Sequence, residues 1–200
     1  MLQLDGLNYI FAKIKFLAMK LKNLLILSII GFISFSSCKK DDPVVPNEEE
    51  LITTLNYTLT DSASIAPNVT LSFTDLDGDG GTAPTITNGV LTANTTYLGS
   101  LVLLNESETP SENITTEIQE EDEEHQFFFV TTVDGVSVTY MDQDSLGNPI
   151  GLSTKLKTEA TGAGNLTITL KHEPTKPNNG TVADAGGETD IEVVFPISVQ

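Results

Sequence analysis

From Leu51 onward, apolar and polar residues alternate in short runs separated by Gly, Asn, Asp and Pro. A period of two is the pattern of a β-strand with one buried face, because successive side chains point to opposite sides of the sheet. We therefore expect strands at each alternating apolar set. These sets are Leu55, Tyr57 and Leu59; Val69, Leu71 and Phe73; Val136, Val138 and Tyr140; Leu166, Ile168 and Leu170; and Ile191, Val193, Phe195, Ile197 and Val199.

Three segments add detail to this pattern. Tyr97 to Leu104 is a mostly apolar run, which predicts a strand buried on both faces. The Asp-Gly pair at 134–135 separates the apolar stretch 127–130 from the set at Val136 and predicts a hairpin turn. Pro196 has no backbone N–H to donate, so it predicts an edge position for the last strand.

One segment has helical spacing. Ser111 to Glu124 contains Ile114 and Ile118 four residues apart. Because it is acidic and poor in apolar residues, we expect a short, solvent-facing helix, with an irregular crossover as the alternative. Seven to nine strands with at most one short helix predict an all-β fold, an antiparallel β-sandwich of immunoglobulin or fibronectin III-like character.

The first 37 residues follow a different pattern. Leu24 to Phe35 is a run of twelve mostly apolar residues, shorter than the roughly 20 that a membrane-spanning helix needs. It has the length of a signal-peptide core, with Lys20 and Lys22 before it and small residues after it. Met19 is a natural start, and residues 1–18 then are an upstream extension from a misassigned start codon. The alternative is a longer positively charged region that includes Lys13 and Lys15.

The segment Phe35-Ser36-Ser37-Cys38 resembles the lipobox of bacterial lipoproteins, whose cysteine is acylated. Cys38 is the only cysteine of the chain, so it has no intramolecular disulfide partner. The residues that follow, Lys39, Lys40, Asp41 and Asp42, look like the lysine-then-acidic export signal of Bacteroidota-type surface lipoproteins. These resemblances imply a protein anchored by lipid in the outer membrane and facing the cell exterior.

The patterns divide the chain into three parts. Residues 1–37 are the predicted signal peptide. Residues 38–50 are the lipidated cysteine and an acidic tether that contains Pro43 and Pro46 and has no apolar periodicity. Residues 51–200 are the predicted single β-sandwich domain, which is long enough to bury a core.

Three stretches of this domain also look like a group of small Bacteroidota lipoproteins. They are Asp-Leu-Asp-Gly-Asp-Gly-Gly at 75–81, Glu-His-Gln-Phe-Phe-Phe at 124–129 and Gly-Gly-Glu-Thr-Asp-Ile-Glu-Val at 186–193. The group is sometimes labelled "type 1 periplasmic binding fold superfamily", a label that implies two α/β lobes. The strand pattern and the scarcity of helix predict a β-sandwich instead.

The charge balance limits the possible partners. Without residues 1–37 the chain has six lysines, no arginine and 27 carboxylates. Nucleic-acid phosphates bind clustered Lys and Arg, so we expect no nucleic-acid partner. A strongly negative field either attracts cations and basic partners or only keeps a surface protein soluble.

The best local motif for a bound ion is the turn at 75–81. Asp75, Asp77 and Asp79 stand at alternate positions before a glycine, which matches the first half of a calcium loop. The position that an EF-hand fills with Glu is Ile86, and strands are predicted on both sides, so an EF-hand is excluded. The remaining alternatives are a calcium-stabilised β-turn and a solvated turn.

Other acidic turns and both histidines are weaker candidates. Two turns offer oxygen ligands for a cation: Asp142, Asp144 and Asn148 in one, and Asp184, Glu188 and Asp190 in the other. His125 follows the acidic block Glu120–Glu124, and we expect a solvated acidic face that raises its pKa, with a metal site as the alternative. His172 is in phase with Leu170, and we expect it to extend the inward face as a hydrogen-bonded histidine rather than as a ligand.

Two serines lie in short sequences that resemble O-glycosylation sequons of Bacteroidota envelope proteins. They are Ser62, in Asp61-Ser62-Ala63, and Ser145, in Asp144-Ser145-Leu146.

Little in the chain supports catalysis. It has no Gly-x-Ser-x-Gly, His-Glu-x-x-His or phosphate-binding glycine loop, and it has two histidines, no arginine and no tryptophan. We expect no enzymatic activity and assign no catalytic residue. The first function that we predict is a surface-displayed, non-enzymatic domain that binds a ligand or a partner such as an envelope protein or glycan. The alternative is a structural or adhesive envelope component stabilised by calcium, the one cofactor that the motifs suggest.

Overall fold

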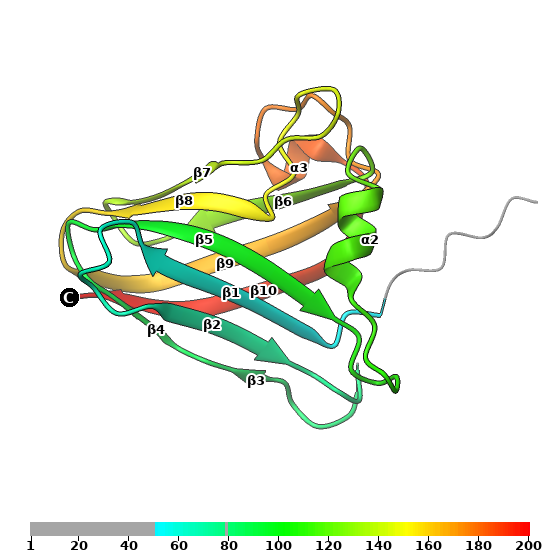
Figure 1. Ribbon diagram of the computed structural model, residues 1–200, viewed down its shortest axis with the longest axis horizontal. Helices are drawn as coiled ribbons and strands as arrows, with labels where there is room; N and C mark the ends of the chain where they lie inside the picture. The colour runs from blue at the N-terminus through cyan, green and yellow to red at the C-terminus, as the bar shows by residue number, and fades with distance from the viewer. Residues whose placement is uncertain (1–50, 79) are drawn as a thin grey trace, which may run out of the picture. The chain divides into compact units, whose positions relative to one another are not determined.

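A computed structural model describes residues 51–78 and 80–200, and these residues form two β-sheets with helix α2 at one end (Figure 1). The six-stranded sheet has the order β3-β2-β1-β5-β8-β7, and the four-stranded sheet has the order β4-β10-β9-β6. Neighbouring strands are antiparallel except β4 and β10, which are parallel. This arrangement confirms the predicted all-β sandwich.

The strands of the larger sheet are β1 (Thr54–Asp61), β2 (Val69–Thr74), β3 (Thr85–Ile86), β5 (Thr96–Leu104), β7 (Val136–Tyr140) and β8 (Ser153–Thr158). Those of the smaller sheet are β4 (Gly89–Leu91), β6 (His125–Thr131), β9 (Gly162–His172) and β10 (Glu188–Val199). The ten strands of the described residues exceed the predicted seven to nine. The two shortest, β3 and β4, have two and three residues and are too short to show an alternating pattern.

The hydrophobic core lies between the sheets, because the long strands each have one apolar face. Its buried residues include Leu55, Tyr57 and Leu59 of β1; Tyr97, Leu101 and Leu103 of β5; Leu166, Ile168 and Leu170 of β9; and Val193, Phe195, Ile197 and Val199 of β10. Burial raises the pKa of Tyr57 to about 12, so its hydroxyl stays protonated where it meets Thr154 Oγ1 at 2.6 Å. The alternating sets of the sequence therefore identify the core correctly.

Strand β5 corrects the prediction that Tyr97 to Leu104 is buried on both faces. Its burial alternates residue by residue, and Leu98 and Val102 are 48% and 40% exposed. The outer face of an antiparallel sheet is commonly solvated, and single exposed apolar residues are ordinary there. An unbroken apolar run therefore does not require two buried faces.

The turn at Asp134-Gly135 is present, but it does not form a hairpin. Gly135 has the positive φ of +75° that favours glycine. The flanking strands, however, belong to different sheets, since β6 pairs with β9 and β7 pairs with β8. The turn connects the two layers of the sandwich, so the hairpin prediction is wrong.

Strand β10 is an edge strand along only part of its length. The short strand β4 pairs with Ile197–Val199, so β10 is internal at its C-terminal end. Pro196 lies just before this paired segment and opposite Asn165 of β9. Its missing N–H therefore falls where β4 offers no partner, which agrees with the reason for the edge prediction.

Helix α2 (Ile114–Glu120) is short, as predicted, but it is not simply solvent-facing. Ile114 and Ile118 are 1% and 0% exposed and belong to the core cluster. A second helix, α3 (Val182–Ala185), has four residues and is capped by Thr181, whose side chain accepts a hydrogen bond from Asp184 N–H. The prediction of at most one short helix missed it, because four residues are too few for a helical period.

Candidate metal centre

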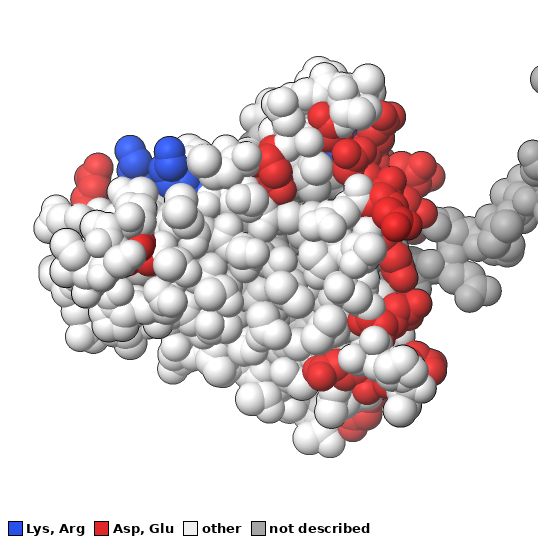
Figure 2. All heavy atoms as spheres, in the orientation of Figure 1, with Lys and Arg blue, Asp and Glu red and all other residues white. Residues whose placement is uncertain are grey.

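Acidic side chains gather at one end of the β-domain. In the view of Figure 2, most of the Asp and Glu side chains lie along the end with α2, whereas the lysines lie near the other end, with a few acidic side chains near them. The lysines of β8 are Lys155 and Lys157. The acidic end is also where β9 ends and where β6 and β10 begin, so three strands of the smaller sheet bring side chains together there (Figure 1).

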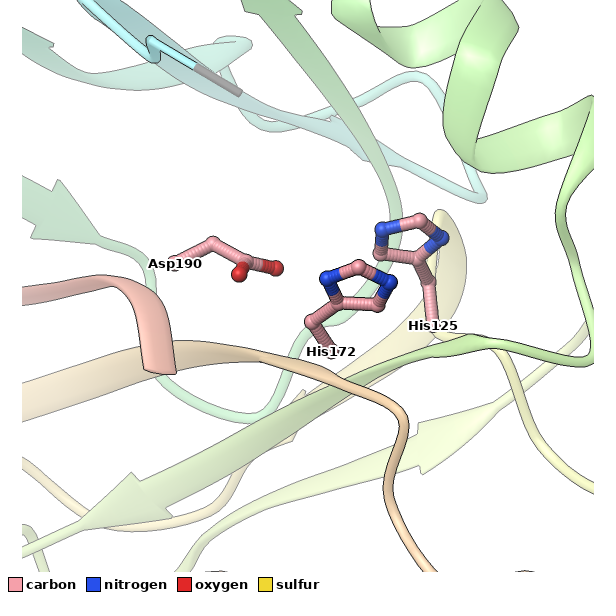
Figure 3. Close-up of side chains that lie close together, drawn as sticks. All are labelled: His125, His172 and Asp190. Carbon is pink, nitrogen blue, oxygen red and sulfur yellow. The ribbon is translucent and has the colours of Figure 1, made fainter. Parts of the chain in front are cut away.

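Two histidines face each other across neighbouring strands at this end. His125 is the first residue of β6 and His172 the last of β9, and they are direct partners in the antiparallel register. Cross-strand partners point to the same face of a sheet. Their rings are stacked, with centroids 4.7 Å apart and planes 11° apart (Figure 3). His125 is 1% exposed and His172 is 7% exposed.

Asp190 joins the histidines from the third strand. The register between β9 and β10 shifts between Thr189 and Ile191, which is a β-bulge at Asp190. A bulge turns a side chain away from the ordinary alternation. Figure 3 shows the Asp190 carboxylate pointing toward the imidazole rings, and one donor atom from each of the three residues lies within 4.8 Å of the others.

Gly187 allows β10 to begin so close to His172. Its φ is +64°, and a Cβ at this position would collide with the carbonyl oxygen of His172. Only glycine fits both requirements without a shift of the backbone. Of the predicted turn Asp184, Glu188 and Asp190, only Asp190 reaches the histidines. Asp184 instead accepts a hydrogen bond from Asn179 N–H at 3.1 Å, and Glu188 is exposed.

His125 differs from the expectation of a solvated histidine with a raised pKa. Burial lowers its pKa, against smaller opposing effects of the Glu121 carbonyl and the nearby carboxylates. The ring Nδ1 lies 3.2 Å from the carbonyl oxygen of Glu121, the C-cap residue that follows α2. The acidic block itself is mostly exposed, as expected. The prediction of a solvated His125 was wrong because β6 begins at this residue and turns its side chain inward.

His172 is buried, as its phase with Leu170 predicts, and it also lies near exposed carboxylates. Its Nε2 is 3.9 Å from Glu124 Oε2. Glu124, His172 and Glu173 form a second group whose donor atoms lie within 4.8 Å of one another. The buried pair of imidazoles therefore has one carboxylate from β10 beside it and two more at its solvent side.

Asp190 also lines an open cleft of about 610 Å³. The cleft has three carboxylate residues, Asp75, Asp190 and Glu192, and an apolar side that includes Phe73 and Ile191. Its rim is the glycine-containing turn that follows β2. We call this hollow the acidic cleft. The predicted calcium turn and Asp190 line the same cleft, a proximity that the sequence did not indicate.

The predicted calcium turn folds back on its own backbone. Asp75 accepts a hydrogen bond from Gly78 N–H at 3.0 Å, and Asp77 accepts one from Thr82 N–H at 2.8 Å. The bond from Thr82 is the main reason that the pKa of Asp77 lies below its usual value. Asp79 lies outside the described residues. The turn conformation predicted from the glycines is present at Gly78, whose φ is +68°.

The second acidic turn holds a lysine. Asp144 Oδ2 lies 3.3 Å from Lys176 Nζ, and the two side chains are 0% and 6% exposed. Burial raises the pKa of Asp144, but hydrogen bonds from Asn148 and Lys176 outweigh this effect and the net shift is downward. Asp142 accepts hydrogen bonds from Gly151 and Ser153 N–H. A cation at this turn would compete with donors of the protein itself.

The remaining predicted residues are placed as follows. Ser62 is exposed just after β1, and Ser145 is exposed and donates a hydrogen bond to Glu123 Oε1 at 2.5 Å. Cys38, Lys39, Lys40, Asp41 and Asp42 lie outside the described residues, as do the signal peptide and the tether up to residue 50.

Comparisons with known proteins do not assign the chain to a family. No protein-family model, curated protein or solved structure matches it. Among the described residues, no helix is long and apolar enough to span a membrane. The fold and the site therefore define an all-β sandwich with a histidine–carboxylate cluster beside an acidic cleft.

Proposed function

We propose that this chain is a lipid-anchored protein of the outer membrane, facing the cell exterior, whose β-sandwich binds a ligand without converting it. The acidic cleft is the observation that supports the binding function best. It is open to solvent, it has apolar side chains beside three carboxylate residues, and it lies at the end of the domain where negative charge is concentrated. Such a field raises the local concentration of cations and basic groups.

The anchor follows from the pattern around Cys38. Each buried methylene contributes about 0.8 kcal/mol to membrane binding, so two or three acyl chains hold a protein where one does not. Protease added to intact cells tests the orientation. The β-domain should be degraded in intact cells, and an outer-membrane protein that faces the periplasm should survive in the same sample. Survival of the β-domain would contradict exposure on the cell surface.

Narrowing the cleft is expected to reduce ligand binding. Ala83 is exposed and lines the cleft, so the variant Ala83→Trp adds a large side chain there without disturbing the core. Ala160→Trp is the matched control, because Ala160 is also exposed and lies between β8 and β9, away from the residues that line the cleft. Surface-labelled cells are crosslinked, and the recovered partners are quantified by mass spectrometry. Ala83→Trp should lower recovery of the bound partner by about tenfold, equivalent to about 1.4 kcal/mol. Equal recovery with both variants would exclude the cleft as the binding surface.

The alternative function is a structural or adhesive envelope component stabilised by calcium, and the folded turn at Asp75 and Asp77 favours it. Calcium at 100 times its dissociation constant adds about 2.7 kcal/mol of stability, which is about 5 to 10 °C in melting temperature for a domain of this size. Under this alternative, Ca²⁺ added to chelator-treated protein raises the melting temperature by that amount. Asp77→Asn should abolish the rise, and Glu108→Gln, an equal loss of charge at an exposed site, should not. The same melting curve with and without Ca²⁺ would count against this function.

A further inference from the structure

We propose that His125, His172 and Asp190 bind one divalent first-row transition-metal ion, such as Zn²⁺, beside the acidic cleft. This proposal rests on the proposed function, because it names a metal ion as a ligand at the end of the domain that contains the acidic cleft. No part of it requires the calcium turn at Asp75.

The backbone places the three donors without help from flexible loops. His125 and His172 are fixed as direct partners of the β6–β9 ladder, and the bulge at Asp190 brings a carboxylate from β10 to the same place. Sites held by strands are more precise than sites held by loops. Gly187 adds a second constraint, since its close approach to the His172 carbonyl fixes how β10 enters the site.

The distances are close to those of a bound ion. Zn–N and Zn–O bonds are about 2.0–2.2 Å long, so two ligands of a tetrahedral ion lie about 3.3 Å apart. The three donor atoms lie within 4.8 Å of one another in the metal-free arrangement. The stacked rings have nearly parallel planes, so their nitrogen lone pairs do not converge on one point in this arrangement. Binding therefore requires the His172 ring to rotate and turn a nitrogen toward His125 Nε2 and Asp190.

The hydrogen bond of His125 selects the donor atom. Metal-binding histidines commonly donate the second ring N–H to a backbone carbonyl, which fixes the tautomer and the ring orientation. His125 Nδ1 has this arrangement with the Glu121 carbonyl oxygen at 3.2 Å. The nitrogen that ligates the ion is then Nε2. Glu121 is the C-cap residue of α2, so the end of the helix takes part in orienting the site.

The donor set favours a transition metal over calcium or magnesium. Ca²⁺ and Mg²⁺ prefer six or more oxygen ligands, whereas imidazole suits zinc, copper, iron and nickel. Two imidazoles and one carboxylate leave at least one coordination position for water or another ligand. Asp190 is the one member of the cluster that also lines the acidic cleft. Glu124 and Glu173 beside His172 add negative charge that favours a cation.

Two lysine side chains near the histidines, those of Lys176 and Lys171, are held by oxygen atoms of other groups. Lys176 Nζ donates to the carbonyl oxygens of Asp122 and His125 at 2.7 Å, and it pairs with the Asp144 carboxylate. Lys171 is buried on the neighbouring position of β9, and its Nζ donates to Thr189 Oγ1 at 2.9 Å. Both ammonium groups are thus held by oxygen atoms other than those of the Asp190 carboxylate.

Titration of the metal-stripped, detergent-solubilised lipoprotein with Zn²⁺ tests the proposal. We expect one high-affinity ion per chain, a rise in melting temperature, and tetrahedral visible absorption when Co²⁺ replaces Zn²⁺. His172→Gln should weaken binding by about 100-fold and Asp190→Asn by about tenfold or more, because changing a residue that only hydrogen-bonds to a metal ligand already costs about 10- to 100-fold. Glu192→Gln is the matched control for Asp190→Asn, since it removes the same charge from the same strand and cleft. It should change the affinity by no more than about twofold, because a screened surface charge acts weakly.

The outcomes separate the proposal from adventitious binding. If Glu192→Gln weakens binding as much as Asp190→Asn, or if His172→Gln binds like the wild type, the ion is held by surface carboxylates and the proposal is wrong. Asp190→Asn keeps the test valid if the histidine variants do not fold, because Asp190 is only half-buried. If no Zn²⁺ binds while Ala83→Trp still reduces ligand capture, the metal site is wrong and the proposed function stands. If Zn²⁺ binds as expected but Ala83→Trp changes nothing, the site stands and the wider role of the cleft is wrong.

Discussion

Replacing Cys38 with alanine is expected to remove the protein almost completely from the outer membrane. The thiol is the only acylation point that the sequence offers, and at about 0.8 kcal/mol for each buried methylene two or three acyl chains supply nearly all of the membrane affinity. Membrane fractionation and the incorporation of labelled palmitate measure the loss. Without cleavage, the apolar run Leu24–Phe35 would hold the precursor at the inner membrane, so we expect the variant there or in degraded form.

Ser37→Ala is the control for this variant, because it keeps a small residue before the cysteine and leaves the acylated thiol in place. It should be lipidated and sorted like the wild type. Asp41→Asn with Asp42→Asn tests the export signal separately and should retain the lipid while lowering protease sensitivity on intact cells. Outer-membrane levels of Cys38→Ala equal to those of the wild type would show that Cys38 is not the anchor.

Replacing Lys176 with methionine is expected to destabilise the β-domain by about 3 kcal/mol. Removing one partner of a buried ion pair leaves the other charge uncompensated, which costs about 3–5 kcal/mol. The lower value applies because Asp144 keeps its hydrogen bonds from Leu146 and Asn148. Chemical denaturation gives the free energy of unfolding directly. Thermal denaturation should show a fall of about 6 to 12 °C.

Lys157→Met is the matched control, since it removes the same charge from an exposed position of β8. It should change stability by no more than about 0.5 kcal/mol. The double variant Lys176→Met with Asp144→Asn should recover much of the loss, because no buried charge remains. Equal stability of Lys176→Met and Lys157→Met would contradict the buried pair.

The effect of Lys176→Met also has a defined pH dependence. The folded-state pKa of Asp144 is lowered, so its contribution to stability is present above the unfolded value of about 3.9 and is lost as the pH falls through the folded value. The difference between wild type and Lys176→Met should therefore be largest near neutral pH and should shrink in acid.

The sequence predicted the layered β fold because period-two alternation directly reports a half-buried strand. β1, β9 and the C-terminal part of β10 are examples, since their inward residues are the alternating apolar sets. Alternation does not report which strands pair. The turn at Asp134-Gly135 therefore looked like a hairpin although it joins two sheets.

The candidate site was predicted only in part, and for a related reason. The turn that contains Asp190 was only a weaker candidate for a cation, and His172 was expected to point inward without being a ligand. Their meeting with His125 depends on strand pairing and on a one-residue bulge. Neither has a local signal in the sequence. The acidic block before His125 also suggested solvent exposure, whereas the side chain direction is set by the start of β6. The Asp144–Lys176 pair, 32 residues apart, was missed because charged partners across loops have no fixed spacing.

Anomalous X-ray diffraction at the zinc absorption edge, from crystals of the protein grown with Zn²⁺, tests the central claim most directly. The claim is that the acidic end of this sandwich binds a metal ion through two strand-paired histidines and a bulge aspartate. We predict one strong anomalous peak about 2.0–2.2 Å from His125 Nε2, a nitrogen of His172 and an oxygen of Asp190. Peaks only at exposed carboxylates, with no density between the two imidazoles and Asp190, would contradict the claim.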